Sequence, residues 1–262
     1  MIFLSDLDRT LIFSYKRLSS DNLCVEKKDG KELSYMTRRS AKLFSELIPK
    51  VIFIPITTRS KEQYERIVFP DGYVPRYAVI DNGANLLVDG VPDREWRKEF
   101  EEEFRRASDE INECRKFLQN EKDVYFEIRI VDGSFLFTKA HNTSEVINKM
   151  RGSVRTAHTS FCRNGEKLYV IPDGISKGRA ADKIREWLPG HRLIAAGDSL
   201  FDRQMLQRAD IAIIKQGELT GMEINPVQIS DDYEDDPDFV LDRLSKIISG
   251  GGSFFGEQSA EK

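Results

Sequence analysis

The sequence predicts an α/β fold in which a parallel core sheet is accompanied by a separate, inserted α+β lobe. Three short apolar runs, at 1–4, 51–56 and 193–196, each end abruptly in polar side chains, as buried parallel strands do. Between these runs, apolar residues recur every three or four positions, which is typical of helices that pack on a sheet. From about residue 85 to 171 the pattern changes to a long amphipathic helix and half-polar strands, which indicates a second lobe.

The remaining core elements follow in chain order. Residues 11–33 are polar and irregular, which predicts a loop or a hairpin. A short helix is expected around 64–68 and a strand at 77–80. Three further helices are predicted from apolar stripes at helical spacing: Ala41, Phe44, Leu47 and Ile48; Ala181, Ile184, Trp187 and Leu188, in a helix that opens at Ser176-Lys177-Gly178; and Val240, Leu241, Leu244, Ile247 and Ile248.

The lobe begins with one long helix and continues as a small sheet. The helix is predicted from a stripe of Trp96, Phe100, Phe104, Ala107, Ile111, Cys114 and Leu118, which we interpret as core packing. Alternating residues predict a strand over 124–130 with one buried and one wet face. Strands at 135–138, 156–161 and 168–171 and a helix at 146–150 complete the lobe. Polar residues on its wet face are candidate substrate contacts, but a solvated sheet surface explains them as well, and none is assigned a role: Glu127, Arg129, Lys139, His141, His158 and Arg163.

Composition narrows the class of protein. The 262 residues are 40% hydrophobic, enough for a core and a lobe, and no stretch approaches the roughly 20 apolar residues of a membrane span. A net charge of −4 predicts no general attraction to nucleic acid or to an anionic membrane. Three widely separated cysteines without zinc spacing, and the lack of a signal-peptide pattern, favour reduced thiols in the cytoplasm. Oligomeric state is left open.

Two aspartates follow the first predicted strand at the positions where its carboxyl end meets solvent. In the segment 5–10, Asp6 and Asp8 are two residues apart, so in a continuing strand they would point the same way. Two such charges 4 Å apart repel by roughly 4 kcal/mol at an effective dielectric of 20. A bound cation would offset this repulsion. A solvated acidic turn is the alternative interpretation.

A second acidic pair follows the strand at 193–196. This pair favours a bound cation over a solvated acidic turn. Asp198 and Asp202 lie in the segment Gly197-Asp198-Ser199-Leu200-Phe201-Asp202. The carboxyl ends of neighbouring parallel strands meet in one crevice, so the two pairs could share a metal. Carboxylate oxygens without a nearby Cys or His cluster favour Mg²⁺ over zinc.

Two further segments suit a phosphate. The strand at 51–56 ends in Thr57-Thr58-Arg59-Ser60, which offers hydroxyls and a cation. Lys177 opens a helix, where the helix dipole disfavours a cation, so it is a candidate to bind a phosphate or a carboxylate. Each signal is weak by itself, because such loops and first-turn lysines are common on protein surfaces.

Taken in order, the four segments resemble the motifs of the haloacid dehalogenase superfamily of phosphatases and phosphotransferases. Asp6, Asp8 and Thr10 match its Asp-x-Asp-x-Thr motif, and Thr57, or Thr58 in the competing register, matches its second motif. Lys177 matches the third motif. Gly197, Asp198 and Asp202 match the Gly-Asp-x-x-x-Asp of the fourth.

The position of the lobe is similar to that in members with a C2-type cap, such as sucrose-phosphatase-like, mannosyl-3-phosphoglycerate-phosphatase-like and Cof-type sugar phosphatases. The resemblance implies a Rossmann-like core at 1–84 and 172–249, an α+β cap domain at 85–171 and a flexible tail at 250–262. Departures from these enzymes are Arg9 and Thr58, where Gly is frequent, and Phe201, where Asn is frequent.

The resemblance also implies an activity and roles for individual residues. It implies Mg²⁺-dependent hydrolysis of a small phosphorylated metabolite, such as a sugar phosphate, through an aspartyl-phosphate; a phosphotransferase or mutase, or a non-catalytic binding module, are the alternatives. The implied catalytic residues are Asp6, Asp8, Thr57 and Lys177. The implied metal ligands are Asp6, Asp8 through its main-chain oxygen, Asp198 and Asp202, and the implied substrate-binding residues are Thr10, Thr58, Arg59 and Asn82.

Overall fold

The computed structural model describes residues 1–14, 22–215, 219, 227–230 and 236–250. The predicted tail at 250–262 therefore lies outside the described residues, except for Gly250. The chain divides into two compact units. Unit 1 comprises residues 1–54, 67–74 and 187–262, and unit 2 comprises residues 55–66 and 75–186.

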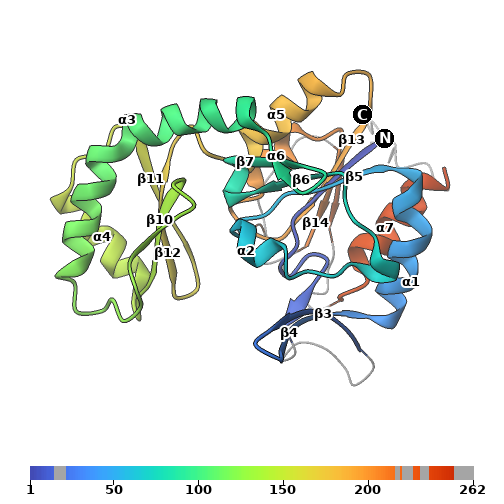
Figure 1. The fold of residues 1–262 in the computed structure, drawn as a ribbon, viewed down its shortest axis with the longest axis horizontal. Helices are drawn as coiled ribbons and strands as arrows, with labels where there is room; N and C mark the ends of the chain where they lie inside the picture. Colours follow the sequence, from blue (N-terminus) through green and yellow to red (C-terminus); the bar gives the residue numbers. More distant parts are fainter. Residues whose placement is uncertain (15–21, 216–218, 220–226, 231–235, 251–262) are drawn as a thin grey trace, which may run out of the picture. The chain divides into compact units, whose positions relative to one another are not determined.

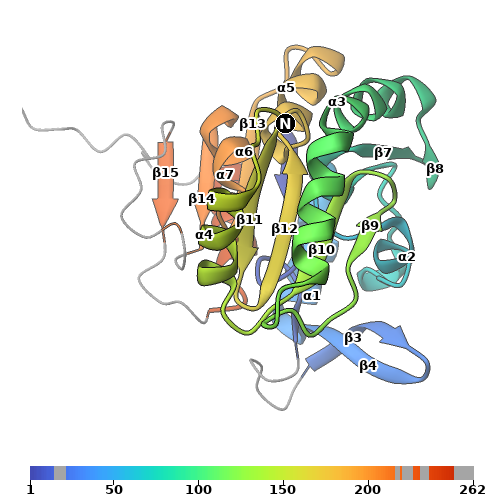
Figure 2. The same ribbon diagram turned by 90° about the vertical axis from the view of Figure 1, so that its left-hand side faces the viewer.

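The main sheet of unit 1 confirms the predicted α/β class. Its strand order is β15-β14-β13-β1-β5, and the β1–β13, β13–β14 and β14–β15 pairs are parallel (Figures 1 and 2). The strand bounds are β1 Ile2–Ser5, β5 Ile52–Pro55, β13 Leu193–Gly197, β14 Ile211–Ile214 and β15 Val227–Ser230. The residues of β1 and β13 are all buried, as continuous apolar runs in a covered parallel sheet predict.

Helices and a small antiparallel sheet complete unit 1. The helices are α1 Arg38–Leu47, α6 Arg203–Arg208 and α7 Phe239–Ile248, with 3₁₀ turns at Ile48–Lys50 and Pro70–Gly72. The polar region 11–33 contains a hairpin, with β2 Phe13–Ser14, β4 Lys31–Thr37 and β3 Asn22–Lys28 in the order β2-β4-β3. An aromatic cluster fills the space between α1 and the sheet: Phe3, Phe44, Phe53, Phe69 and Tyr73.

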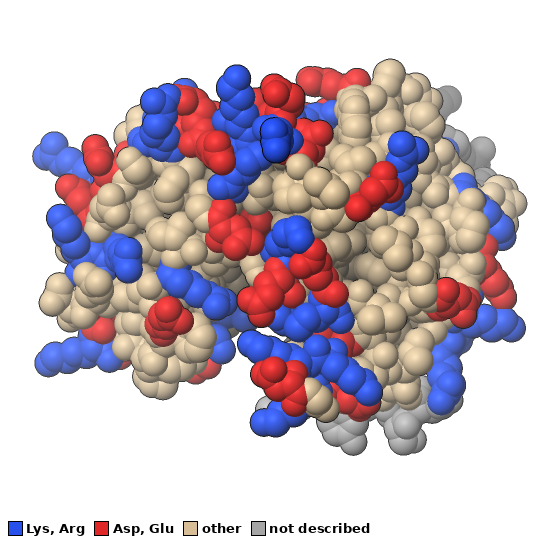
Figure 3. Space-filling view, viewed as in Figure 1, with Lys and Arg blue, Asp and Glu red and all other residues tan. Residues whose placement is uncertain are grey.

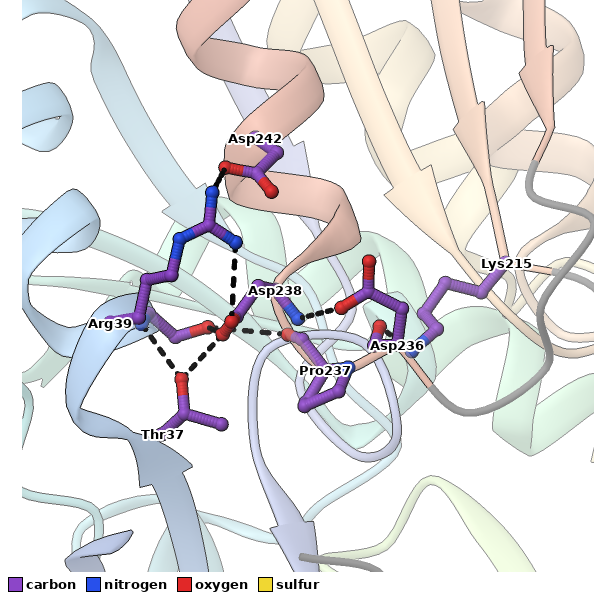
Figure 4. A network of polar contacts seen from close by, with 8 residues as sticks. Thr37, Arg39, Lys215, Asp236, Pro237, Asp238 and Asp242 are labelled. Atoms are coloured by element: carbon purple, nitrogen blue, oxygen red, sulfur yellow. Dashed lines mark hydrogen bonds and ion pairs between the residues drawn. The ribbon is translucent and has the colours of Figure 1, made fainter. Parts of the chain in front are cut away.

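A polar network joins the first turns of α1 and α7 (Figure 4). The carboxylate of Asp238 accepts hydrogen bonds from the hydroxyls of Thr37 and Ser40, and Arg39 pairs with both Asp238 and Asp242. The Thr37 hydroxyl accepts the Ser40 N–H at 2.8 Å and so caps α1. Asp238 therefore links the first turns of the two helices.

Unit 2 begins with the segment that follows β5. Helix α2 Lys61–Tyr64 is short and lies earlier than the helix predicted around 64–68, because Ser60 and Gln63 form a capping box at its start. A three-stranded sheet, in the order β6-β7-β8, consists of β6 Tyr77–Ile80, β7 Asn85–Val88 and β8 Val91–Pro92. Helix α5 Lys177–Trp187 begins at the predicted lysine.

The region predicted as an inserted lobe forms an antiparallel sheet with two helices on one face. The helices are α3 Arg94–Gln119 and α4 Thr143–Ser153, and the strands are β9 Arg129–Val131, β10 Phe135–Lys139, β11 Thr159–Asn164 and β12 Lys167–Pro172. The sheet order is β11-β12-β10-β9 (Figure 2). Side chains of α3 and α4 pack with one face of this sheet, including Leu136, Leu168 and Val170. We call this the helix face, and the other the open face.

One lobe strand is shorter than the sequence predicts. The alternation over 124–130 yields a regular strand only at 129–131, with an isolated bridge between Val124 and Ala140. Upstream of β9, the Thr138 hydroxyl donates to the Phe126 carbonyl at 2.9 Å. Phe126, predicted to be buried with Ile128 and Ile130, is instead 36% exposed and packs edge-on against Phe137 of the open face.

Charges of both signs are intermixed on the surface shown in Figure 3. This distribution agrees with the small net charge of −4. Within the described residues, no helix is both long enough and apolar enough to cross a membrane. The three cysteines, Cys24, Cys114 and Cys162, are free thiols, as predicted.

Candidate active site

Asp6 lies directly after β1 and is held in the sheet by its backbone. Its N–H donates to the Ala196 carbonyl at 2.9 Å, which continues the β1–β13 pairing by one residue. The side chain is 5% exposed, and the Thr10 hydroxyl donates to its Oδ2 at 3.4 Å. Thr10 is fully buried, so the structure places this predicted substrate-binding residue beside the Asp6 carboxylate.

Asp8 lies beyond the end of β1, in a turn. Strand β1 ends at Ser5, and the Leu7 carbonyl accepts the N–H groups of Thr10, Leu11 and Ile12, which turns the chain sharply. Leu7 is buried and Asp8 is exposed, because the turn replaces the strand alternation on which that prediction depended.

Arg9 occupies the tightest point of the same turn. Its φ of 65° lies in the left-handed region, where a side chain other than glycine is uncommon. This backbone conformation accounts for glycine being frequent at the corresponding position of similar enzymes. The Arg9 Nε lies 3.2 Å from the Asp198 Oδ2, so the guanidinium carries positive charge toward that carboxylate.

The loop after β13 is organised by Asp202. The Asp202 Oδ2 accepts the Ser199 hydroxyl at 2.7 Å, the Ser199 N–H at 3.0 Å and the Asp198 N–H at 3.2 Å. Gly197 permits this closure, because a Cβ there would lie 2.4 Å from the Asp202 Cβ. Asp202 is fully buried, and its contacts fix the conformation of the backbone that carries Asp198.

Asp6, Asp198 and Asp202 form a buried acidic cluster. Their nearest carboxylate oxygens all lie within 4.8 Å of one another, so one ion could contact all three. Buried like charges at this distance require compensation, and three hard oxygen donors fit a cation such as Mg²⁺. The side chain of Asp8 is not part of this group.

In unit 2, the predicted phosphate-binding segment follows β5. Thr57 is fully buried, and its N–H donates to the Val79 carbonyl at 2.9 Å. The Thr57 hydroxyl accepts the Arg59 N–H at 3.2 Å, which leaves its own proton available for a second bond. Thr58 and Arg59 are partly exposed, and the Arg59 guanidinium donates to the Gln63 carbonyl at 3.3 Å.

Residues 81–83 form a strained turn between β6 and β7. Asp81, Asn82 and Gly83 all have positive φ, at 53°, 60° and 109°. The Asn82 N–H donates to the Thr57 carbonyl at 2.9 Å, and its side-chain amide donates to the Ile175 carbonyl at 3.3 Å. A Cβ on Gly83 would lie 2.5 Å from the Ser176 carbonyl oxygen, so glycine is required there. The turn therefore connects the Thr57 segment with the start of α5.

The pKa of the Asp81 carboxyl group in this turn is strongly perturbed. From the sequence, no role was assigned to Asp81. Burial, reinforced by the nearby Asp132 carboxylate, raises the pKa of Asp81 to about 8. The Asn85 side-chain amide donates to its Oδ2 at 2.6 Å, and Arg97 donates to the Asn85 Oδ1 at 3.2 Å. An Asp-Asn-Gly segment predicts a left-handed turn, but Asn85 and Arg97 gave no sequence signal of their own.

Lys177 is the first residue of α5 and is 1% exposed. A buried ammonium is costly unless anionic or hydrogen-bonding groups surround it. The Ser176 hydroxyl accepts the Arg179 N–H at 3.1 Å and so supports the first turn of the helix. The structure thus confirms the predicted place of Lys177 at a helix start and shows that it is not a solvated surface lysine.

The fold is similar to that of several phosphatases and related proteins of known structure. A sucrose-phosphatase from Synechocystis, solved with sucrose and phosphate, matches with a TM-score of 0.63 and 13% identity, over 94% of this chain and 96% of that one. A trehalose-6-phosphate phosphatase related protein matches with a TM-score of 0.55 and 16% identity, over 96% and 98%. A haloacid dehalogenase-like hydrolase from Bacillus subtilis matches with a TM-score of 0.51 and 17% identity, over 94% and 90%.

The fold and the ordered motifs define a phosphatase of the haloacid dehalogenase type. Residues 1–218 match the model of the sucrose-6F-phosphate phosphohydrolase family, and the chain belongs to that family. No protein with a curated description matches the sequence.

Proposed function

We propose that this protein is a Mg²⁺-dependent phosphomonoesterase that hydrolyses a small sugar phosphate through an aspartyl-phosphate on Asp6. Its membership of the sucrose-6F-phosphate phosphohydrolase family supports a sugar phosphate as the substrate class. The observation that carries the mechanism is the buried cluster of Asp6, Asp198 and Asp202, which is built to hold a cation beside a carboxylate nucleophile. The Synechocystis sucrose-phosphatase, whose structure contains sucrose and phosphate, supports the same class.

Asp6 is the proposed nucleophile. One of its carboxylate oxygens attacks phosphorus, and the bond between phosphorus and the sugar oxygen breaks. Asp8 protonates the departing sugar oxygen, then removes a proton from the water that cleaves the aspartyl-phosphate and releases inorganic phosphate. The exposed position of Asp8, after the turn at Leu7, suits exchange of a proton with a leaving group and with water.

Asp6, the Asp8 main-chain oxygen and Asp198 are the proposed Mg²⁺ ligands. When bound, Mg²⁺ offsets the negative charges of the carboxylates and of the phosphoryl group. Asp202 supports this arrangement through its hydrogen bonds to the Asp198 and Ser199 N–H groups, which hold the Asp198 carboxylate in the cluster. Its own oxygens complete the acidic group.

Thr57 and Lys177 are the proposed ligands of the phosphoryl oxygens. The Thr57 hydroxyl can donate one hydrogen bond, and the Lys177 ammonium supplies positive charge. The proposed roles of Thr10, Thr58, Arg59 and Asn82 are to bind the substrate or to position these groups. Residues 85–171 are proposed to act as the cap that selects the leaving group, since every residue assigned to phosphoryl transfer lies outside them.

The test is steady-state hydrolysis of sugar phosphates with Mg²⁺, comparing the wild type with Asp6→Asn. Asn is nearly isosteric but a poor nucleophile, so turnover should be lost while the unfolding curve stays close to that of the wild type. Asp8→Asn should lower kcat by about 10² to 10⁴-fold, because proton transfer is lost. Full activity of Asp6→Asn, with phosphate release confirmed, would show that the covalent mechanism is wrong.

A further inference from the structure

The open face of the lobe sheet carries a group of cations on aromatic rings. Cross-strand pairing places Arg129 directly opposite Phe137, and Phe137 opposite Tyr169. The Arg129 guanidinium carbon lies 5.1 Å from the Phe137 ring centre, and the Lys139 Nζ lies 5.0 Å from the Phe126 ring centre. These aromatic surfaces fix the two cationic side chains above one sheet surface.

A third cation lies beside them. Lys139 and Lys167 are directly opposite each other on β10 and β12. Like charges in this position destabilise a sheet unless an opposite charge compensates them. Among the residues that the structure describes, no carboxylate forms an ion pair with Arg129, Lys139 or Lys167. Glu166, which precedes Lys167 in the turn between β11 and β12, instead accepts the Tyr125 hydroxyl at 2.8 Å.

The same hairpin reaches the segment proposed to bind phosphate. The Asp132 carboxylate, at the end of β9, accepts the Lys61 N–H at 3.1 Å, and Lys61 is only four residues after Thr57. Arg129 is the first residue of β9 and lies three residues before Asp132, so this contact ties the hairpin that carries Arg129 to the segment that follows Thr57.

We propose that Arg129 and Lys139, assisted by Lys167, bind a second negatively charged group on the substrate, so that the enzyme prefers a sugar phosphate carrying a carboxylate or a further phosphate over a neutral sugar phosphate. This inference rests on the proposed function and names its substrate class more narrowly. The Arg129 guanidinium can form a bidentate hydrogen bond with a carboxylate or a phosphate, and the Lys139 ammonium adds a positive charge. Phe126, which is 36% exposed, offers an apolar contact for the carbon skeleton between the two charges, and the buried Phe137 and Tyr169 pack beneath it.

The experiment compares three esters on the full-length protein with Mg²⁺: glucose 6-phosphate, 6-phosphogluconate and glucose 1,6-bisphosphate. We expect kcat/KM for 6-phosphogluconate or glucose 1,6-bisphosphate to exceed that for glucose 6-phosphate at least tenfold. The ester with the higher kcat/KM shows whether the second anionic group is a carboxylate or a phosphate. Arg129→Gln and Lys139→Gln should each lower that preference about tenfold through KM. Both variants should hydrolyse p-nitrophenyl phosphate at nearly the wild-type rate. Arg151→Gln, at an exposed position of α4, is the matched control and should change nothing.

Calorimetric binding separates this inference from the proposed function. In the Asp6→Asn variant, which cannot turn over, the preferred anionic ester should bind at least tenfold more tightly than glucose 6-phosphate, and Arg129→Gln should abolish the difference. Equal kcat/KM and equal affinity for neutral and anionic esters would overturn the inference while leaving the phosphatase intact. Failure to hydrolyse any ester, with the binding preference retained, would instead overturn the proposed function.

Discussion

Asp81→Asn should abolish a specific pH dependence of the stability of unit 2. In the wild type, burial and Asp132 hold the pKa of Asp81 at about 8, against an ordinary value of 3.8. Between these two values the folded protein keeps the proton that the unfolded chain has lost. The free energy of unfolding therefore falls as the pH rises, by roughly 1.4 kcal/mol per pH unit, and becomes level above pH 8.

The expected magnitude is large enough to measure with chemical denaturation. The loss is about 3 kcal/mol from pH 6 to pH 8 and about 6 kcal/mol over the whole window. Asn carries no titrating proton, tolerates the left-handed φ of 53°, and its oxygen can still accept the Asn85 amide proton. The Asp81→Asn variant should therefore lack this decline, and its stability relative to the wild type should increase steadily from pH 5 to pH 8.

Urea titrations at pH 5, 6, 7, 8 and 9 provide the assay. Trp96 is a local probe, because it is 5% exposed and its indole N–H donates to the Gly83 carbonyl at 3.0 Å. A Trp187→Phe background removes the other tryptophan signal. Asp89→Asn is the matched control, since Asp89 also has a left-handed φ, of 50°, but is exposed. Parallel curves for the wild type and Asp81→Asn across this range would refute a protonated Asp81.

Three further predictions concern the acidic cluster. Removal of divalent cations with a chelator should abolish turnover. Mg²⁺ should restore turnover and Ca²⁺ should not, because calcium takes a larger and looser ligand shell. Full activity in excess chelator would show the metal assignment to be wrong. Arg9→Gly removes a cation that pairs with Asp198, so it should lower the Mg²⁺ concentration for half-maximal activity by up to about fivefold, the equivalent of a 1 kcal/mol ion pair. An unchanged Mg²⁺ dependence would argue against competition between Arg9 and Mg²⁺ for Asp198. Gly197→Ala should destabilise the fold by about 1 to 3 kcal/mol and weaken Mg²⁺ binding, because the added Cβ would displace Asp202. Calorimetry measures both effects. Gly152→Ala on α4, where no atom lies near the added Cβ, is the control and should change neither quantity.

The sequence by itself determined the parallel core, the order of the four motifs and the place of Lys177 at a helix start. These features depend on local patterns: apolar runs that end in polar residues, and helical spacing of apolar side chains. The predicted meeting of Asp6 with Asp198 and Asp202 was also correct, because parallel pairing of β1 with β13 brings their carboxyl ends together.

Only the tertiary structure decided which neighbours each polar group has. The turn at Leu7 places Asp8 outside a regular strand, and Phe126 packs against Phe137 of the open face, so strand alternation does not describe either place. The raised pKa of Asp81 depends first on burial and then on Asp132, 51 positions later in the chain. The pairing of Lys139 with Lys167 depends on sheet register. A local pattern carries no information about such partners, because burial and Coulomb interactions are set by distance in space and not by separation along the chain.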